Sequence, residues 1–322
     1  MHCPRLGHYA RLNSNGTIGC CGHMVDGNQY DTFKQLENSA WLEYLRYQMR
    51  NNIWPKECAR CQQTEELNGT SIRLNSIERD RILKKFNAKY IQLGGTLDNY
   101  CNSACVTCNP SLSTKIGSLK GELVVKDNYE KLKTLPLERI VELDINGGEP
   151  SISVNYNELL NNLPDSVKII RINTNGNCKI KQLKTLLKRG ITVIVTVSFD
   201  GIGAVHDYIR YPVKWKNFEK NLQYYKALSY KYNTLKIDTW TTVSALNVNY
   251  LTDIQNYCKT HDIRHSYAFL NTPKVLNVKY KNWFTQSSKL PNVGTDRDNT
   301  KELEAFLELE EACRQNIERF WI

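Results

Sequence analysis

The chain has 322 residues, of which 41% are hydrophobic and 24% charged, and its formal net charge is +10. This composition is typical of a globular protein with one large core, or one core and a smaller appendage. The longest strongly apolar run, residues 191–197, is too short to cross a bilayer and predicts a buried strand. No apolar segment typical of a secretory signal follows the first residues, so we expect a cytoplasmic protein without membrane contact. The positive charge permits an anionic substrate or a nucleic acid as partner but does not favour either.

Residues 1–85 predict a small, cysteine-rich accessory domain. Within it, residues 9–21 predict a hairpin with its turn at 13–16, and residues 30–52 carry a helical periodicity that ends before Pro55. Five of the eleven cysteines of the chain lie in its first 61 residues. Clustered thiols in an intracellular chain of this length indicate metal binding rather than disulfides.

Residues 86–275 alternate short β-branched runs with amphipathic stretches. The predicted strands are residues 89–95, 140–146, 167–174, 192–199, 235–243 and 264–270. Between them, residues 180–189 and 217–232 predict helices. Six βα units are fewer than a closed eight-stranded barrel needs, so we predict an α/β fold with a partial, TIM-like (β/α)6 barrel. In such folds the chemistry takes place at the carboxyl ends of the strands.

Residues 276–322 predict a long loop followed by a C-terminal helix. The helical part is amphipathic. Its apolar side carries Phe306, Leu309, Cys313, Ile317 and Phe320.

Three cysteines follow the first predicted strand of the barrel directly. Cys101, Cys105 and Cys108 have a C-x3-C-x2-C spacing. Three thiolates within eight residues can hold a cubane iron–sulfur cluster and leave one iron without a protein ligand. The alternative is a zinc site completed by a distant His or Cys, but zinc sites favour paired C-x2-C units. The spacing therefore favours a [4Fe–4S] cluster.

This loop resembles the signature of the radical S-adenosylmethionine superfamily. The resemblance implies that the amino and carboxylate groups of S-adenosylmethionine bind the open iron. It also implies that reduction of the cluster, by a partner such as flavodoxin or ferredoxin, cleaves the cofactor to a 5′-deoxyadenosyl radical that abstracts hydrogen from a substrate. Many members carry a bulky apolar residue next to adenine just before the third cysteine, where this chain has Thr107.

The loop after the second predicted strand of the barrel contains the sequence GGEP. Gly147 and Gly148 allow close approach of the backbone to a ligand, and Glu149 adds an anionic acceptor. A tight turn without chemical interest is the alternative. The GGEP sequence is similar to the family motif that contacts the methionine amino group. After the third strand, Asn175 stands where the family often has a contact to the ribose or the carboxylate.

The loop after the fourth predicted strand begins with SFDG, which resembles the S-x-D-G of the subfamily with accessory clusters. Ser198 and Asp200 are implied as partners of the ribose hydroxyls, and Arg210 as a fork for the methionine carboxylate. Polar residues at strand ends are common, but four such motifs in the right order favour a cofactor site. Cys178 follows the third strand and is a candidate hydrogen donor to a substrate radical, or else an incidental loop thiol.

The N-terminal cysteines resemble half of the accessory-cluster module known as SPASM, or its shorter Twitch form. Cys3, Gly16 and Cys21 have a C-x12-G-x4-C spacing, and Cys58 and Cys61 form a C-x2-C pair. The resemblance implies that these four cysteines hold a second [4Fe–4S] cluster, with the module placed at the front of the chain instead of the end.

The alternative for the N-terminal block is a structural zinc site, with His2, His8 or His23 as spare ligands. Cys20 competes with its neighbour Cys21 as a ligand, and the spacing favours Cys21.

The resemblance implies an enzyme that oxidises or cross-links a peptide. Two rivals remain: radical chemistry on a nucleotide, nucleic acid or sugar, and a non-catalytic iron–sulfur or zinc protein. Nucleic-acid binding predicts strong salt dependence. A non-catalytic protein would not cleave S-adenosylmethionine.

Overall fold

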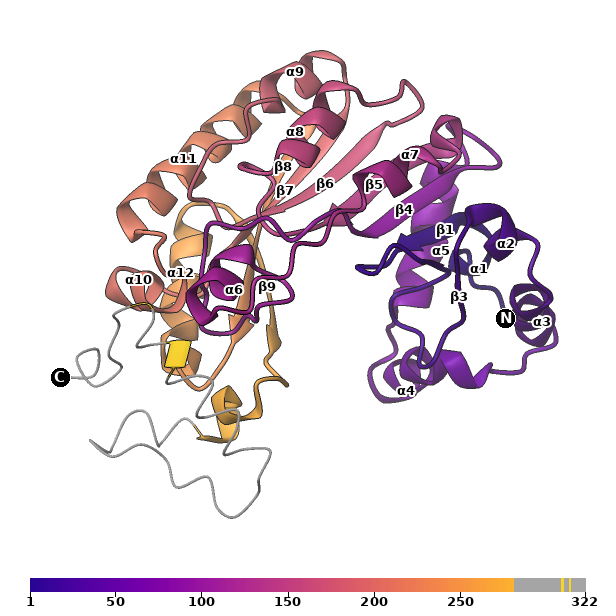
Figure 1. The fold of residues 1–322 in the computed structure, drawn as a ribbon, viewed down its shortest axis with the longest axis horizontal. Helices are drawn as coiled ribbons and strands as arrows, with labels where there is room; N and C mark the ends of the chain where they lie inside the picture. Colours follow the sequence, from indigo (N-terminus) through magenta and orange to yellow (C-terminus); the bar gives the residue numbers. More distant parts are fainter. Residues whose placement is uncertain (281–307, 310–312, 314–322) are drawn as a thin grey trace.

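The computed structural model describes residues 1–280, 308–309 and 313 (Figure 1). The described strands form a single sheet in the order β3-β2-β1-β4-β5-β6-β7-β8-β9. The strands are β1 Tyr9–Leu12, β2 Ile18–Gly19, β3 Gln29–Tyr30, β4 Ile91–Thr96, β5 Ile140–Asn146, β6 Ile169–Thr174, β7 Thr192–Ser198, β8 Leu235–Val243 and β9 Arg264–Phe269. The helices are α1 Arg5–His8, α2 Phe33–Glu37, α3 Ala40–Arg50, α4 Ala59–Asn68, α5 Ile72–Leu83, α6 Thr114–Lys120, α7 Tyr129–Lys133, α8 Val154–Asn161, α9 Leu183–Lys188, α10 Ala204–Ile209, α11 Trp215–Lys231 and α12 Leu251–Thr260.

Strands β4 to β9 are parallel and lie side by side in chain order, with helices between them. This arrangement confirms the predicted α/β fold, with six parallel strands in the predicted order. The predicted strand over 235–243 coincides with β8. Within the described part of the chain, β9 pairs only with β8, so the sheet does not close into a complete barrel.

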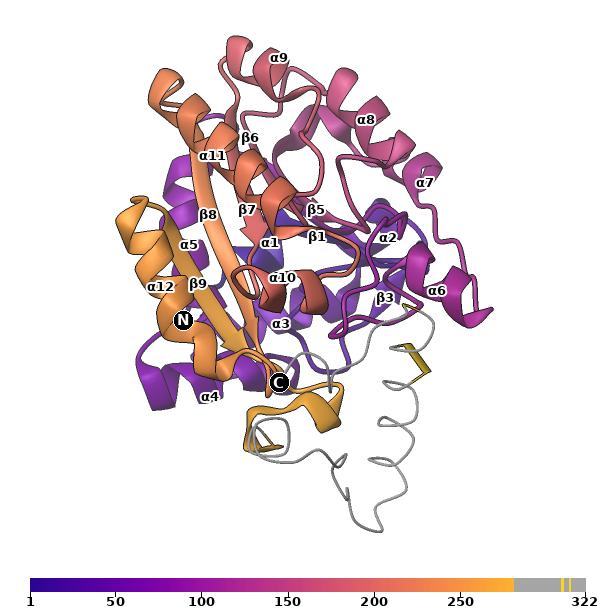
Figure 2. The same ribbon diagram turned by 90° about the vertical axis from the view of Figure 1, so that its left-hand side faces the viewer.

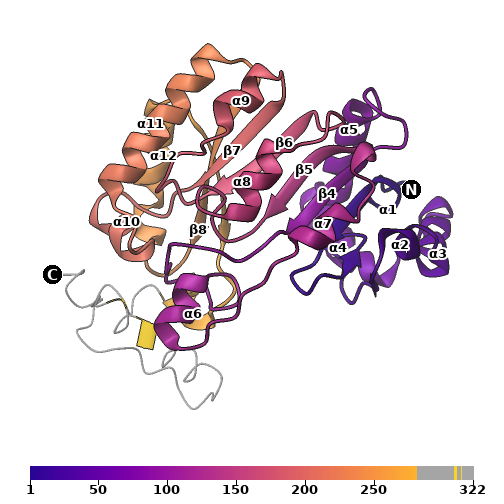
Figure 3. The ribbon, with the colours of Figure 1, turned by 45° about the horizontal axis from the view of Figure 1, so that its top comes forward.

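Helices α8, α9 and α11 lie on one face of the sheet in all three views (Figure 1, Figure 2 and Figure 3). The strand that forms the centre of this packing is β7, which is rich in β-branched residues. Its Val193, Val195 and Val197 are fully buried and belong to the same apolar cluster as Phe218 and Leu222 of α11. This apolar core holds the parallel strands in place, and the polar loops begin at the carboxyl ends of these strands.

The other face of the sheet is covered near its base by α5, a helix that the sequence pattern did not predict. Leu83 of α5 packs against Val141 and Ile169. Arg79 donates from both Nε and Nη2 to the two carboxylate oxygens of Glu142, at 2.6 and 2.5 Å. Glu142 is fully buried, and such a charge is tolerated only when cations and hydrogen bonds compensate its desolvation.

The predicted N-terminal hairpin is confirmed as β1 and β2, with Gly16 in the left-handed region at φ +82°. Strand β1 pairs in parallel with β4, for example through Ala10 and Leu93. The N-terminal strands therefore continue the barrel sheet across the predicted domain boundary at residue 85. The division into two domains itself stays a prediction. The predicted helical stretch over 30–52 contains two helices, α2 and α3.

Most of the predicted loop and helix over 276–322 lies outside the described residues. Leu309 and Cys313 are described, and they are buried against Ala104 and Ile116. None of the described helices has the length and apolar character needed to span a bilayer.

Candidate functional site

The three-cysteine loop connects β4 to α6 and is held by the C-terminal end of α10 and the residues just after it. The backbone N–H of Ala104 donates to the carbonyl of Tyr211 at 2.7 Å, and that of Val106 donates to Ile209 at 3.0 Å. These bonds place the cysteines at the carboxyl ends of the parallel strands, where the βα topology predicts the chemistry.

The three thiols lie close enough to influence one another. Burial and, to a smaller extent, the neighbouring Cys105 raise the pKa of Cys101 to about 11. Burial also raises the pKa of Cys108 to about 12, with Cys105 and Cys101 acting in the same direction. These thiols are therefore protonated at neutral pH, and a metal would have to displace their protons in order to bind.

The Gly147-Gly148 turn is pressed against the chain just before Cys101. A Cβ atom on Gly148 would lie 2.0 Å from the carbonyl oxygen of Tyr100. The next residue, Glu149, donates its backbone N–H to the same oxygen at 2.7 Å. Glycine at 148 is thus required by contact with the chain itself. The turn also lines the cavity described below.

Glu149 is buried, and both of its carboxylate oxygens are occupied by donors of the chain. Oε1 accepts from the backbone N–H of Ser151 at 3.0 Å and from the Thr174 hydroxyl at 2.7 Å, and Oε2 accepts from the backbone N–H of Asn175 at 2.6 Å. Glu149 therefore ties the loop after β5 to the end of β6. Its geometry is that of a positioning residue.

Asn175 connects the end of β6 to the cysteine loop. Its Nδ2 donates to Oδ1 of Asn102 at 2.8 Å and to the hydroxyl of Ser103 at 2.7 Å. Since Asn102 and Ser103 directly follow Cys101, Asn175 fixes the path of the loop between the first two cysteines.

Arg210 faces the cavity with Asp200 behind it. Nη1 of Arg210 is 2.9 Å from Oδ2 of Asp200, whose Oδ1 accepts from the backbone N–H of Thr242. The buried Nε of Arg210 has no hydrogen-bond partner within the described residues. The arrangement presents a fixed cation with an unused donor next to Cys105, where Arg210 opposes the increase in thiol pKa caused by burial.

A cavity of about 410 Å³ joins these groups. Nine of the predicted site residues line it: Cys101, Cys105, Cys108, Gly147, Gly148, Glu149, Asn175, Ser198 and Arg210. Two do not. Asp200 acts through Arg210, and Cys178 lies on the loop beyond β6, where burial raises the pKa of its thiol.

The cavity wall also contains polar side chains that were not predicted. Thr96, Asn146 and Asn173 stand at the ends of β4, β5 and β6, and Nδ2 of Asn173 donates to Oδ1 of Asn146 at 2.6 Å. The available signal was the position of these polar residues at the carboxyl ends of three predicted strands. Asp98, which is fully buried, also belongs to the wall.

The four predicted accessory ligands line a second, separate cavity. Cys3, Cys21, Cys58 and Cys61 surround a space of about 20 Å³, and no residue of this wall belongs to the larger cavity. Burial raises the pKa of Cys3 to about 11 and that of Cys58 to about 12. His23 also lines this space, whereas His2 and His8 do not.

The adjacent residues Cys20 and Cys21 face different surroundings. Cys20 is buried in the main apolar cluster, and its thiol donates to the backbone carbonyl of Arg5 at 3.5 Å. Cys21 instead faces the four-cysteine cavity, where its sulfur accepts from Nη1 of Arg5 at 3.4 Å. Cys21 therefore lies with the other predicted accessory ligands and Cys20 does not; the choice of Cys21 as the ligand stays a prediction.

The two cysteine groups fit thiolate-bound metal in their donor chemistry. The larger cavity also has the volume of a cofactor site and an unpartnered Arg210 nitrogen. Within the described residues, no group of three or more His, Cys, Asp or Glu side chains converges on one metal ion. Metal binding therefore requires some cysteine side chains to turn. In an iron–sulfur cluster each thiolate binds its own iron. The sulfur atoms of the cysteines can therefore lie farther apart than they would around a single zinc ion.

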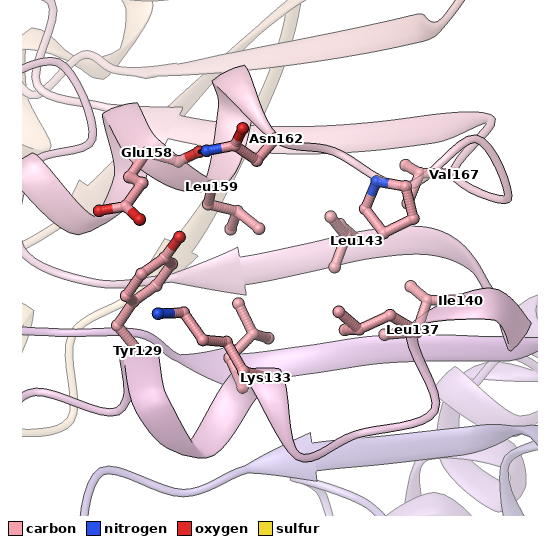
Figure 4. A pocket seen from close by; sticks show the side chains of 11 residues that line it. Tyr129, Lys133, Leu137, Ile140, Leu143, Glu158, Leu159, Asn162 and Val167 are labelled. Atoms are coloured by element: carbon pink, nitrogen blue, oxygen red, sulfur yellow. Dashed lines mark hydrogen bonds between the residues drawn. The ribbon is translucent and has the colours of Figure 1, made fainter.

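Another cavity, of about 270 Å³, lies under α7 and α8 and contains no cysteine (Figure 4). Its apolar end is formed by side chains that include Leu137, Ile140 and Leu143, while Tyr129 and Glu158 lie at the other end. This wall carries a single carboxylate, that of Glu158, and no histidine or cysteine.

No family model matches the chain, and no curated protein matches it. Among solved structures, the chain is similar to one described as native anSMEcpe with bound AdoMet, at 16% sequence identity and a TM-score of 0.43, over 68% of this chain and 61% of that chain. It is also similar to Streptococcus suis SuiB bound to S-adenosylmethionine, at 17% identity and a TM-score of 0.40, over 82% of this chain and 62% of that chain.

A third solved structure, Streptococcus suis SuiB bound to the precursor peptide SuiA, is similar at 16% identity and a TM-score of 0.39, over 95% of this chain and 69% of that chain. The chain covers less than two thirds of the length of the first two structures. At these TM-scores the likeness carries no conclusion about activity. The fold assignment rests on the strand order and register of this chain.

Proposed function

We propose that the chain is an enzyme of the radical S-adenosylmethionine type, with its active site in the 410 Å³ cavity. The observation that carries this proposal is that Cys101, Cys105 and Cys108 share one cavity with the GGEP turn and Arg210. A [4Fe–4S] cluster with S-adenosylmethionine on its open iron would supply the electron that cleaves the cofactor and so generate a hydrogen-abstracting radical.

The residues of the chain divide the remaining tasks. The three thiolates would hold the cluster, and the backbone carbonyls of the Gly147-Gly148 turn would accept hydrogen bonds from the cofactor ammonium group. Arg210 offers a cation for the cofactor carboxylate, and Asp200 keeps that cation in place. The hydroxyl of Ser198 is available to a ribose hydroxyl. Cys178 as a hydrogen donor stays a prediction.

We further propose a thiolate-bound metal at the N-terminal cavity, with a second [4Fe–4S] cluster as the first choice and zinc as the alternative. The proposed substrate is a peptide that becomes oxidised or cross-linked, because the cysteine spacing in residues 1–61 resembles modules whose bearers often modify peptides. The proposed electron donor is a reductase such as flavodoxin or ferredoxin. All of these assignments rest on resemblance to the family.

The test is cleavage of S-adenosylmethionine by the full chain after anaerobic reconstitution with iron and sulfide and reduction with dithionite. We expect 5′-deoxyadenosine to form with the wild type and not with the variant Cys101→Ala/Cys105→Ala/Cys108→Ala. Cys258→Ala is the matched control, because Cys258 is a buried thiol of α12 that lines neither cysteine cavity.

A wild type that holds iron but forms no 5′-deoxyadenosine would support the non-catalytic rival instead. For the substrate class, binding of RNA or DNA that weakens steeply between 50 mM and 200 mM salt would favour the nucleic-acid rival over the peptide.

A further inference from the structure

Arg5 is a buried cation on the wall of the N-terminal cavity. Only 8% of its surface is exposed. Its guanidinium carbon lies 3.8 Å from the centroid of the Tyr9 ring, and its Nη1 lies 3.4 Å from the sulfur of Cys21. A guanidinium is therefore enclosed between an aromatic face and a thiol.

No carboxylate forms an ion pair with Arg5 in the described part of the chain. Asp144 is near enough for its ionisation to respond to the charge of Arg5, but no ion pair joins the two groups. A buried cation without an anionic partner is costly, and a neutral thiol is only a weak acceptor. A thiolate at Cys21 would supply the missing negative charge.

The second arginine on this wall, Arg73, is already paired. Its Nε and Nη2 donate to the two oxygens of Glu65 at 2.8 and 2.6 Å, and its Nη1 donates to the backbone carbonyl of His2 at 2.9 Å. Arg5 is thus the arginine of this cavity whose charge is directed at a sulfur atom.

We infer that Arg5 is the counter-cation of the N-terminal metal site and donates a hydrogen bond to the metal-bound sulfur of Cys21. This inference rests on the proposed thiolate-bound metal at that site. Arg5 acts as a positioning residue: it stabilises the charge of the thiolate group and orients Cys21 toward the metal. Loss of such a partner outside the ligand shell typically weakens metal affinity by about 10- to 100-fold.

The experiment uses the full chain with Cys101→Ala/Cys105→Ala/Cys108→Ala as the parent, so that only the N-terminal thiols remain as a cluster of ligands. Co²⁺ is the probe, because thiolate-to-metal absorption reports both binding and the charge at sulfur. In this parent, we expect Arg5→Met to weaken Co²⁺ binding by about tenfold or more and to shift the thiolate absorption. Arg5→Lys, which keeps the charge, should recover part of the affinity.

A stability comparison separates this role from simple packing. In the metal-free protein, Arg5→Met removes an uncompensated buried cation, so its stability should equal or exceed that of the parent. In the Co²⁺-loaded protein the same variant should be less stable than the parent. Equal losses in both forms, or unchanged Co²⁺ affinity, would overturn the inference while leaving the metal site in place.

A parent that shows no thiolate absorption with Co²⁺, and retains neither iron nor sulfide after reconstitution, would refute the N-terminal metal site and with it the role of Arg5. Cleavage of S-adenosylmethionine by the wild type would still test the barrel site separately.

Discussion

At the scale of single residues, the contact between Gly148 and Tyr100 leaves no room for a side chain. The carbonyl oxygen that a Cβ atom would meet at 2.0 Å belongs to the backbone, so it cannot move without displacing the cysteine loop. We expect Gly148→Ala to lower the free energy of unfolding by about 3 kcal/mol and to reduce the iron content of the reconstituted protein. Chemical denaturation and iron analysis check both.

Gly7→Ala is the control for this prediction. Gly7 lies in α1, and a Cβ atom there meets nothing within 4 Å. Alanine also favours a helix over glycine. If Gly148→Ala changed the free energy of unfolding no more than Gly7→Ala does, the contact between Gly148 and Tyr100 would not contribute to stability.

A second residue, His206, makes stability depend on pH. It is fully buried, with its ring centroid 4.3 Å from that of Phe218. Burial, assisted by the charge of Arg210, lowers its pKa to about 3. The unfolded chain takes up a proton near pH 6.5, whereas the folded chain resists protonation down to about pH 3. Stability should therefore decrease as pH falls through this window, by about 1.4 kcal/mol per unit.

The measurement is the free energy of unfolding of the metal-free protein between pH 7.5 and pH 5, for the wild type and for His206→Phe. The variant keeps an aromatic ring in the cluster but cannot bind a proton. At pH 5 the wild type should have lost about 2 kcal/mol more than the variant. Parallel curves would show that His206 is not the responsible group.

At the scale of elements, Glu149 joins two strand ends. Each carboxylate oxygen accepts from a backbone N–H, one from Ser151 and one from Asn175. In Glu149→Gln, either orientation of the amide places its NH₂ group against one of these donors. We expect a loss of about 2–3 kcal/mol in unfolding free energy and weaker binding of S-adenosylmethionine.

Glu130→Gln is the matched control for this change. Glu130 pairs with Lys133 on the surface, and its side chain is 83% exposed, so the loss should stay below about 0.5 kcal/mol. A loss for Glu149→Gln that is equally small would mean that the β5–β6 connection does not depend on this carboxylate.

The elements also show which parts of the fold a sequence can reveal. The parallel strands were predictable because runs such as residues 192–198 are β-branched and buried on both faces. Helix α5 was not predictable from apolar periodicity, because its buried residues are Arg73, Ser76, Asp80 and Leu83. The helix is held to the sheet by the ion pair of Arg79 with Glu142 of β5, and no local pattern records a partner so distant in sequence.

In the candidate site, too, some features could be predicted from the sequence and others could not. The cysteine spacing and the glycine turn were visible because their chemistry is local. The internal bonds of Glu149 and the paired side chains of Asn146 and Asn173 depend on strand neighbours. A polar residue at a strand end suggests a site, but its partner becomes known only from the register of the sheet.

At the scale of the whole molecule, β1 and β4 make one sheet of the N-terminal segment and the barrel. Their parallel pairing runs from Tyr9 and Gln92 to Leu12 and Gly95. A chain limited to residues 86–275 would expose the β4 edge, and unpaired edges promote association. At equal concentration, light scattering should therefore show larger species for this fragment than for the full chain. A monodisperse fragment with intact secondary structure would instead establish two independent domains.

The same pairing imposes an order on biosynthesis. Strand β1 leaves the ribosome long before β4, so its hydrogen-bonding edge waits for a partner that is distant in sequence. The short pairing of β1 with β2 gives little stability on its own. Cys21, Cys58 and Cys61 are synthesised during this interval, and Cys3 precedes β1. All the residues that line the N-terminal cavity precede β4 in the sequence, so this lining is synthesised while β1 still lacks its parallel partner.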